Sequence, residues 1–449
     1  MTTPPGSGTI EVPEKNHGWQ VTFAGLGINL ALGILYTWSV IAGGLPKEWT
    51  QSDKAWPYSV ACLVFCLIMV PAGRMQDRVG PRLVATIGGI LVGAGMIMAS
   101  YMITPRGFIL GFGVLAGAGI GFGYAAATPP AVKWFPPART GMIAGIVVSG
   151  FGLASVYAAP LAKYLIGKYE VAGAMRILGI AFLVVVVALA QLLRAPHKVM
   201  QFVKGLGKPG ELKAAEAGPV KKENFTPGEM LRTWQFYALW FMYACGAGAG
   251  LMVISVASKL GTGKTIGTLK ASTIVVVTLA IGNGAGRIIA GMLSDRLGRR
   301  ATLAIFFVFQ AVMVILLAAS GSIPALDAGA VLAVGAALIG ANYGSNLALF
   351  PSATKDYYGL KNFGVNYGLV FTAWGIGGFM LAKFAGWVYD GLVVASWKDS
   401  FNFAYYTSAA LLVLAAIMTF VLKAPYHLEP AAAGNPVANQ EARPEPART

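Results

Sequence analysis

Twelve long runs of apolar residues alternate with short polar connectors from Trp19 onward. Each run approaches or exceeds the roughly 20 residues that a helix needs to cross a bilayer. Apolar residues cover every side of these runs, whereas a water-soluble helix has one apolar stripe. The pattern predicts an all-α integral membrane protein with twelve transmembrane helices near 19–43, 55–76, 82–104, 107–130, 140–164, 172–194, 232–257, 268–293, 300–320, 327–351, 363–390 and 402–423.

A long polar stretch at 195–231 divides these runs into two sets of six. We expect 19–194 and 232–424 to form two six-helix bundles, joined by this stretch as a cytoplasmic linker with room for a short surface helix. The ends are polar: 1–18 has no cleavable-signal pattern, and 425–449 is rich in Ala, Pro and Glu, which predicts a disordered tail. The two bundles therefore carry the fold.

Basic residues gather in alternate connectors. Of the 34 Lys and Arg residues, 22 lie in the tails and in the connectors after even-numbered runs, whereas 11 lie on the other side. Positively charged connectors face the cytoplasm, so we expect both termini in the cytoplasm and the protein in the cell's plasma (inner) membrane. Lys259, Lys264 and Lys270 go against this pattern, either because they recruit anions or because they lie in a solvated loop.

The composition agrees with a membrane protein. Hydrophobic residues make up 56% of the chain and charged residues 12%, compared with about a quarter charged in soluble proteins. The net charge of +16 comes from the connectors, so we expect no nucleic-acid partner. Cys62, Cys66 and Cys245 are too few for a disulfide framework and are interpreted as packing residues. We expect no metal and no cofactor.

One charge lies deep inside an apolar run. Arg287 ends the sequence Gly282–Arg287, within an uncharged stretch from about 271 to 293. A cation in hydrocarbon costs roughly 2.5–3.5 kcal/mol on insertion scales. Two explanations stay open at this point. Arg287 binds an anionic substrate, or it extends toward the nearer membrane surface, since Asp295 is only about 12 Å along the helix at 1.5 Å per residue.

The connectors after the second and eighth runs repeat one motif. The first reads G-R-M-Q-D-R-V-G-P-R from Gly73 and the second reads G-M-L-S-D-R-L-G-R-R from Gly291, which places Asp77 and Asp295 218 positions apart. Both fit G-x-x-x-D-R-x-G followed by basic residues. Two copies at equivalent places indicate an internal duplication of six helices.

These paired connectors resemble the signature of the major facilitator superfamily, which lies between the second and third helices of each half. The resemblance implies the major facilitator fold, with two pseudo-symmetric six-helix bundles that rock around a site at the membrane midplane. It also implies that Asp77, Arg78, Asp295 and Arg296 are gate and structural residues at the cytoplasmic face. They are not expected to bind substrate.

A narrower resemblance is to the oxalate/formate antiporter and monocarboxylate (lactate) transporter branch of that superfamily. In that branch the arginine of the eighth helix binds the substrate carboxylate, and Arg287 falls on it. The match rests on the order and spacing of short segments: Tyr36–Ser39, Lys133–Pro136, Gly228–Thr233 with Gln235–Phe236, Leu349–Ser352 and Asn366–Gly368.

The resemblance implies a substrate site around Arg287. Its planar guanidinium can hold a carboxylate by two parallel hydrogen bonds. Asn283, one turn earlier on the same face, donates to that carboxylate or to a substrate hydroxyl, or else forms an interhelical hydrogen bond. Aromatic positions of the oxalate transporter are matched by Tyr36, Tyr124, Tyr343 and Phe371. The tyrosines then supply hydroxyls and ring walls, with simple packing as the alternative for each.

The departures from the oxalate transporter indicate a different substrate. Trp374 replaces the lysine of the eleventh helix, which is the family's second cation, and so becomes a hydrophobic wall. Polar positions have become apolar at Leu35, Phe151 and Leu347. Lys383 offers a second cation near the outer mouth or simply extends to the membrane surface. One cation in a more apolar pocket suits a substrate with one carboxylate and a small organic tail.

Proton coupling has no obvious protein group. Animal monocarboxylate transporters carry an acidic residue one turn before the eighth-helix arginine and a lysine in the first helix, but this chain has Asn283 and no such lysine. No Asp or Glu lies deep in any run. A proton can instead travel with the substrate, because a neutralised carboxylate lets the loaded carrier reorient.

Together these features predict a secondary active transporter for a lactate-like or pyruvate-like monocarboxylate, working by proton symport and alternating access as a monomer in the lipid bilayer. An oxalate/formate-type organic anion antiporter is the alternative. An enzyme is not expected, since the runs contain no paired acids, metal set or nucleophile with its base. A sensor would need an appended signalling domain, and neither the linker nor the tail is long enough for one.

Overall fold

A computed structural model describes residues 16–196, 220–221, 224–256, 260, 263–389, 391–393, 396, 400–425 and 428–429. The first bundle is built almost entirely from helices, and its first and fourth spans change helix type along their length. Its elements are α1 (Gly18–Leu32), η1 (Gly33–Thr37), α2 (Trp38–Gly43), α3 (Gln51–Val79), α4 (Pro81–Tyr101), α5 (Pro105–Phe108), the π-helical η2 (Ile109–Ala116), α6 (Gly117–Lys133), η3 (Pro137–Arg139) and α7 (Thr140–Ala190).

The second bundle has one continuous helix per span. Two-residue strands and the four-residue α8 lie outside the spans. The elements are β1 (Val220–Lys221), α8 (Pro227–Met230), α9 (Trp234–Val256), β2 (Thr265–Ile266), β3 (Leu269–Lys270), α10 (Ala271–Leu297), α11 (Arg299–Ser320), α12 (Gly329–Tyr358), α13 (Phe363–Tyr389), α14 (Asn402–Val421) and β4 (Leu428–Glu429).

Eleven helices within the described residues are long and apolar enough to cross a membrane. One of them, α7, has 51 residues and contains two spans, because its backbone leaves helical geometry at Glu170 (φ 57°, ψ 180°). The expected all-α membrane protein with twelve spans is confirmed. The predicted end of the tenth span at 351 was too early, since α12 continues through Pro351 to Tyr358. A proline is tolerated in a membrane helix where neighbouring helices compensate the lost hydrogen bond.

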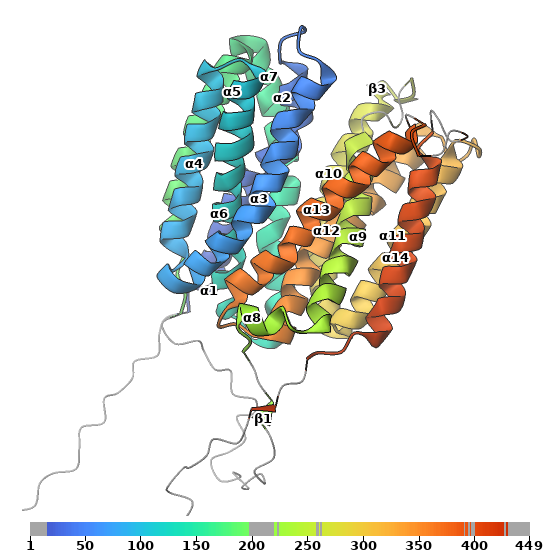
Figure 1. The fold of residues 1–449 in the computed structure, drawn as a ribbon. Coiled ribbons are helices and arrows are strands. Elements are labelled where there is room, and N and C mark those ends of the chain that lie inside the picture. The colour runs from blue at the N-terminus through green and yellow to red at the C-terminus, as the bar shows by residue number, and fades with distance from the viewer. Residues whose placement is uncertain are drawn as a thin grey trace, which may run out of the picture.

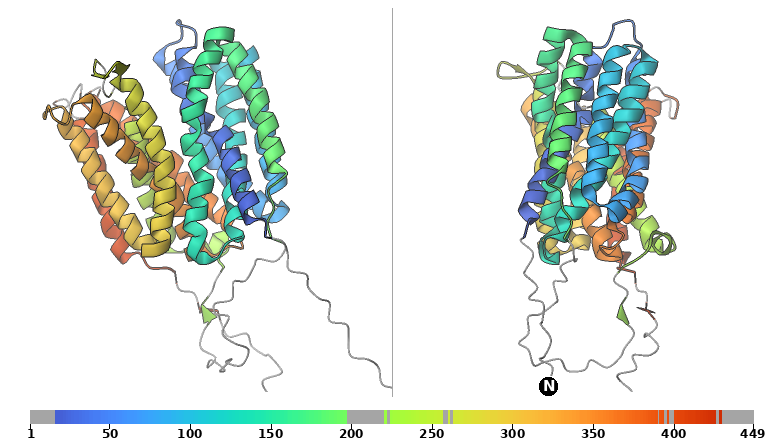
Figure 2. Two further views of the ribbon diagram at one scale, coloured as in Figure 1. Left: turned by 180° about the vertical axis from the view of Figure 1, so that it is seen from behind. Right: turned by 90° about the vertical axis from the view of Figure 1, so that its left-hand side faces the viewer.

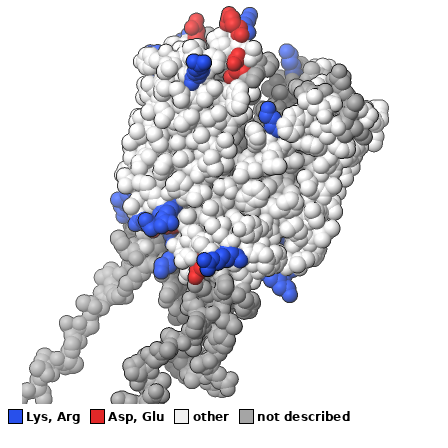
Figure 3. All heavy atoms as spheres, viewed as in Figure 1, with Lys and Arg blue, Asp and Glu red and all other residues white. Residues whose placement is uncertain are grey.

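The two bundles touch at one end of the molecule and diverge at the other (Figures 1 and 2). We call these the α8 end, at the bottom of Figure 1, and the β3 end, at the top. Between the bundles, α3 packs on α13 and α7 packs on α10. The molecular outline also dips between the bundles at the β3 end (Figure 3). The molecule is thus closed toward the α8 end and splayed toward the β3 end.

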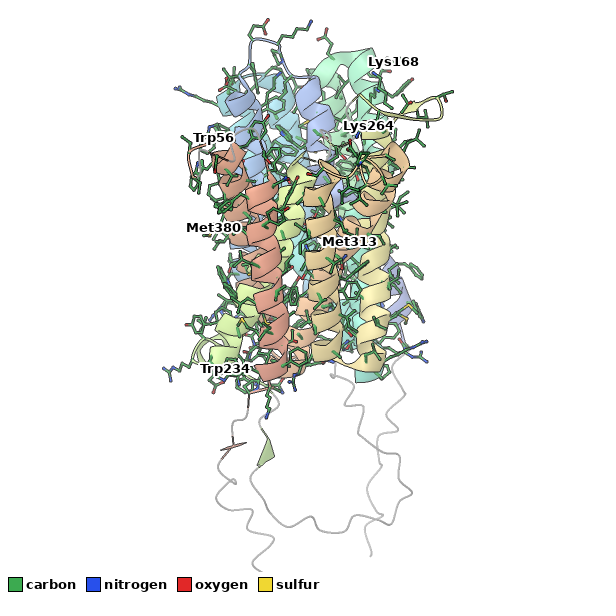
Figure 4. All side chains as sticks on the ribbon, turned by 90° about the vertical axis from the view of Figure 1, so that its right-hand side faces the viewer. Trp56, Lys168, Trp234, Lys264, Met313 and Met380 are labelled. Atoms are coloured by element: carbon green, nitrogen blue, oxygen red, sulfur yellow. The ribbon has the colours of Figure 1, made fainter. Side chains whose placement is uncertain are left out.

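A broad uncharged surface lies between the two ends of the molecule, and we call it the belt. Most of the Lys, Arg, Asp and Glu side chains visible in Figure 3 lie near these ends. Trp56 and Trp234, which are 55% and 50% exposed, lie toward opposite edges of this belt, and Met380 lies between them (Figure 4). Tryptophan is enriched at membrane–water interfaces. The belt has the composition expected of a multi-pass membrane protein.

The tails fall mostly outside the described residues. This holds for residues 1–15 of the expected N-terminal tail and for most of the C-terminal tail, predicted to be disordered at 425–449. Within the latter, β4 pairs antiparallel with β1 of the linker, so Leu428 lies opposite Lys221. The short surface helix that the linker allowed corresponds to α8, which begins at Thr226 with a capping box to Glu229. The remaining linker residues from 197 to 219 lie outside the described residues.

Small residues bring α10 unusually close to α12. A Cβ atom added at Gly286 would overlap the carbonyl oxygen of Ala341, and one added at Gly344 would overlap the carbonyl oxygen of Asn283. In lipid, close helix packing replaces the hydrophobic effect as the main attraction between helices. The glycines thereby fix the height and rotation of α10, which carries Arg287.

We expect Gly286→Val to lower stability, because the added carbons have no space beside the main chain of Ala341. Overpacking costs about 1–3 kcal/mol, which corresponds to a drop of roughly 5 °C in the unfolding midpoint. Thermal unfolding of the purified full-length protein measures it. The matched control is Gly386→Val, since a Cβ there meets nothing within 4 Å. Equal midpoints for the two variants would contradict the packing account.

Candidate functional site

Arg287 lies in the seam between the bundles, on α10, with 0% of its surface exposed. The facing helix α7 makes room for it with glycine. A Cβ added at Gly152 would lie 3.1 Å from both the Arg287 Nε and the Asn283 Oδ1, and one added at Gly145 would overlap the Arg287 carbonyl oxygen. Glycine at these two positions therefore allows α10 to bring a large cation into the seam.

The Arg287 guanidinium is only partly satisfied by the protein. Its Nε donates to Asn283 Oδ1 at 3.0 Å, and its Nη1 donates to the main-chain carbonyl of Val148 on α7 at 2.5 Å. Its Nη2 is buried and has no hydrogen-bond partner. An unsatisfied buried charged donor is costly. The Tyr36 hydroxyl lies within reach of the guanidinium, but the hydrogen bonds described for Arg287 include no carboxylate.

Asn283 contacts Arg287 within α10. Its expected donation to the substrate or to another helix stays a prediction. In the structure its side-chain oxygen accepts the Arg287 Nε, four residues along the same helix. Asn283 is 2% exposed and is therefore buried between the helices of the seam. It therefore orients the guanidinium in this state.

A tyrosine pair from opposite bundles lies beside Arg287. The hydroxyls of Tyr36 and Tyr343 are 2.5 Å apart, and Trp374 Nε1 donates to the Tyr343 hydroxyl at 2.8 Å. The guanidinium lies within electrostatic range of the Tyr36, Tyr124 and Tyr343 phenols. Tyr343 and Trp374 are buried, whereas Tyr36 is partly accessible. These four aromatic residues and the guanidinium thus share one region of the seam.

An aromatic cluster closes this region across the seam. Phe65 of α3 lies 5.1 Å from Phe371 and 5.3 Å from Trp374, measured between ring centroids, and it also contacts Tyr124 at 5.4 Å and Phe151 at 5.8 Å. Phe371 and Trp374 stack at 5.2 Å. Aromatic pairs at such distances are worth about 0.5–1.5 kcal/mol beyond their buried area. Phe371, Trp374 and Phe65 therefore form one packed aromatic cluster.

Three tyrosines surround Phe371, and their hydroxyls lie close to one another. Tyr124, Tyr243 and Tyr367 come from α6, α9 and α13, and their ring centroids lie 5.3, 6.2 and 5.7 Å from that of Phe371. The buried Tyr367 hydroxyl interacts with the hydroxyls of both Tyr124 and Tyr243. Tyr124 was predicted from the resemblance. Tyr243 and Tyr367 were missed, although Tyr367 could have been found by its i, i+4 spacing to Phe371.

The second copy of the repeated motif joins the two bundles at the α8 end. Asp295 of α10 accepts hydrogen bonds from the main-chain nitrogens of Gly141 at 2.9 Å and Met142 at 2.8 Å, which begin α7 of the other bundle. Arg299 donates to Asp295 at 2.7 Å and Lys355 donates to Thr140 at 3.1 Å. A carboxylate at a helix N-terminus satisfies free N–H groups and favours the helix dipole. We call this contact the Asp295 latch.

The first copy makes the symmetrical contact. Asp77 of α3 accepts from the main-chain nitrogens of Gly364 at 3.1 Å and Val365 at 3.0 Å, which begin α13. Lys133 lies 4.0 Å from Asp77. Gly80 and Gly298, the last glycines of the two motifs, have nearly the same backbone (φ 91°, ψ 167° and φ 85°, ψ 158°), which favours glycine. The motif duplicates a structure as well as a sequence.

We call the Asp77 contact the Asp77 latch. Arg78 and Arg296 do not join the Asp77 and Asp295 latches. Both side chains are exposed, and the cations beside the two carboxylates are Lys133 and Arg299. The reason is helical spacing. Arg296 follows Asp295 directly and points away from it, whereas Arg299 is four residues on and returns to the same face.

Other candidates lie outside the site. Lys383 is exposed on α13. Cys66 is buried in the seam, where a Cβ on Gly375 would overlap its side chain, in keeping with a packing role. Among the described residues no group of three or more His, Cys, Asp or Glu side chains is placed to hold a metal ion. The chemistry that the seam offers is thus recognition by one cation, hydroxyls and aromatic rings.

Comparison with known proteins decides the family. The model of the major facilitator superfamily matches residues 20–382 and 239–447. The chain belongs to the major facilitator superfamily. The major facilitator fold is also seen in the crystal structure of the transporter FucP in its outward conformation, which matches 90% of this chain and 98% of its own with a TM-score of 0.65 at 14% identity. Members of this superfamily are transporters, so a transporter is the class of protein shown here.

Two relatives resemble this major facilitator protein over most of their length. The oxalate:formate antiporter of Oxalobacter formigenes is 27% identical over 413 residues, which cover 91% of this chain and 92% of the antiporter. The apicoplast pyruvate carrier 1 of Toxoplasma gondii is 24% identical over 396 residues, which cover 75% of this chain and 69% of the carrier. Both relatives are named for the transport of small carboxylates.

We expect Asp295→Asn to loosen the α8 end, because it removes the charge that holds the start of α7. Two charge-assisted hydrogen bonds are weakened, each worth about 1.5–3 kcal/mol, so the closed population should fall at least about tenfold. Electron paramagnetic resonance can follow the distance between spin labels at positions 139 and 297, which lie in different bundles at this end. Glu48→Gln removes a carboxylate exposed outside the latch and serves as control. An unchanged distance distribution in Asp295→Asn would refute the latch.

Proposed function

We propose that this transporter moves a small monocarboxylate, such as lactate or pyruvate, across the plasma membrane by alternating access. The observation that carries the proposal is Arg287, a fully buried cation whose Nη2 has no partner. A carboxylate bound there satisfies this donor and neutralises the charge in one step. The relatives support the choice of ligand class, since one is named for oxalate and formate and the other for pyruvate.

The surroundings of Arg287 favour one carboxylate over two. The position of the family's second cation is filled by Trp374, whose indole donates to Tyr343. Phe65 and Phe371 place further apolar surface beside it. A second carboxylate would be desolvated against these rings without a partner charge, at a cost of several kcal/mol. A methyl group or a short carbon tail fits the same wall at no such cost.

The proposed alternating access depends on two contacts that join the bundles beside Arg287. Arg287 on α10 donates to Val148 on α7, and Tyr36 meets Tyr343 across the same seam. A carboxylate at Arg287 competes with the Val148 carbonyl for the guanidinium and is the stronger acceptor, because it is charged. We therefore expect the bound substrate to release this tie between the bundles and allow the α8 end to open once the latches part.

We propose that the α8 end faces the cytoplasm. The exposed basic residues Arg78, Arg296 and Arg300 lie at that end, and basic residues concentrate on the cytoplasmic side of membrane proteins. In this orientation both termini are cytoplasmic, and the splayed β3 end faces outward. The structure then corresponds to a carrier ready to receive substrate from outside.

We expect Arg287→Gln to reduce uptake of labelled lactate into proteoliposomes by about tenfold or more, because the amide cannot hold a carboxylate by two charged hydrogen bonds. Arg287→Lys keeps the charge but loses the planar fork and should recover only part of the rate. Lys383→Gln is the matched control, since it removes an exposed cation of the second bundle. Monodisperse elution of each variant checks folding, and wild-type uptake by Arg287→Gln would exclude this site.

The coupling mode is tested by the driving force. Because the sequence places no Asp or Glu deep in any apolar run, we propose that the proton travels with the substrate. Proteoliposomes loaded with buffer alone should then accumulate lactate above its equilibrium level when the outside solution is more acidic than the inside. The alternative is antiport, which the resemblance to the oxalate:formate antiporter favours. Uptake that needs formate or oxalate inside the vesicles and ignores the pH gradient would replace symport by exchange.

A further inference from the structure

A concave site lies at the α8 end, remote from Arg287. It is a cavity of about 640 Å³ between the first turns of α11 and the last turns of α14, completed by the ends of α10 and α12. The helices α11 and α14 pack on each other and lie in the second bundle, on the side away from the first bundle in Figure 1. Arg287 does not line it, and Arg299 is the residue that it shares with the Asp295 latch.

The walls of this cavity carry an excess of positive charge. Arg299, Arg300 and Lys423 line it together with one carboxylate, Asp356. Arg299 is engaged, with its Nε 2.7 Å from Asp356 and its Nη1 2.7 Å from Asp295. Three cations against one anion leave a net positive site.

The other two cations are not tied to carboxylates in the contacts that the structure describes. Arg300 donates to the main-chain carbonyls of Thr419, at 2.9 Å, and Phe420, at the end of α14. Lys423 is exposed just beyond that helix. Neutral carbonyl partners leave the charge of Arg300 uncompensated. The two residues therefore offer positive charge to an anion in the cavity.

The rim of the cavity is apolar and exposed. Phe420 and Leu297 are 72% and 52% exposed, and Ala301 and Ala304 continue the rim along α11. Farther along the same two helices, the exposed side chains of Ile305 and Ile417 face outward. A soluble anion would gain nothing from this surface. A molecule with an anionic head and hydrocarbon chains matches both the basic wall and the apolar rim.

We propose that this cavity binds the head group of an anionic phospholipid from the leaflet at the α8 end. The phosphate lies between Arg300 and Lys423, and the acyl chains follow the exposed faces of α11 and α14. Each basic residue at a membrane surface contributes about 1 kcal/mol toward anionic lipid. The site does not depend on which substrate is transported.

Native mass spectrometry of the purified full-length protein tests the site directly. Phosphatidylglycerol and phosphatidylcholine with identical acyl chains are titrated in turn. We expect phosphatidylglycerol to bind preferentially, and the double variant Arg300→Gln with Lys423→Gln to weaken its binding by roughly tenfold or more. Arg106→Gln with Lys163→Gln removes the same charges from exposed positions at the other end of the first bundle, and this control should bind like wild type.

Three results would overturn the proposal. Equal affinity for the two lipids would show that the basic wall selects nothing. Unchanged phosphatidylglycerol binding by the double variant would place the lipid elsewhere. Displacement of the lipid by millimolar inorganic phosphate would show a site for soluble anions. If the double variant does not remain monodisperse, Lys423→Gln alone decides the question, because Lys423 is exposed beyond the end of α14, and a loss of several-fold is then expected.

Discussion

The fold is arranged around one unbalanced charge, the Arg287 guanidinium buried between two helical bundles. No carboxylate is recorded among its described hydrogen-bond partners, which are the Asn283 side chain and the Val148 carbonyl. Neutral acceptors stabilise a buried cation less than an anion does. The Arg287 cation is therefore oriented but incompletely compensated by the described protein groups. In the proposed function, the substrate carboxylate completes this compensation.

Close helix packing makes this burial possible. Gly145 and Gly152 on α7 let the guanidinium and its main chain enter the seam, and Gly286 and Gly344 hold α10 against α12. Toward the α8 end the same seam continues to Asp77 and Asp295, which cap helices of the opposite bundle. The contacts of Asp77 and Asp295 at the α8 end and the Arg287 cation in the middle thus belong to one continuous interface. A rocking motion of the bundles, as in the proposed function, would have to break both sets of contacts.

Much of this could be predicted from sequence, and the reasons are physical. Apolar runs of membrane-spanning length define the helices directly, since the bilayer sets their length. An arginine in such a run stands out for its cost, and the duplicated motif around Asp77 and Asp295 reveals the two halves.

Other features depended on how helices pack, which the sequence does not display. Phe65 is one apolar residue among many, and only the crossing of α3 and α13 places it against Trp374. The bond from Arg287 to Val148 depends on the relative height of α10 and α7. Arg299 in place of Arg296 beside Asp295 depends on which face of α10 meets the other bundle. Each of these contacts depends on how helices far apart in the sequence are positioned against one another.

The central claim is that the Arg287 guanidinium itself receives the substrate carboxylate. Nuclear magnetic resonance of the protein labelled with ¹⁵N at its arginine side chains observes that group directly, with Arg287→Lys to assign its signal. Titration with lactate should shift the Arg287 signal saturably, whereas lactamide, which has the same shape without the charge, should leave it unchanged. Saturable lactate binding that leaves the Arg287 signal in place would contradict the account.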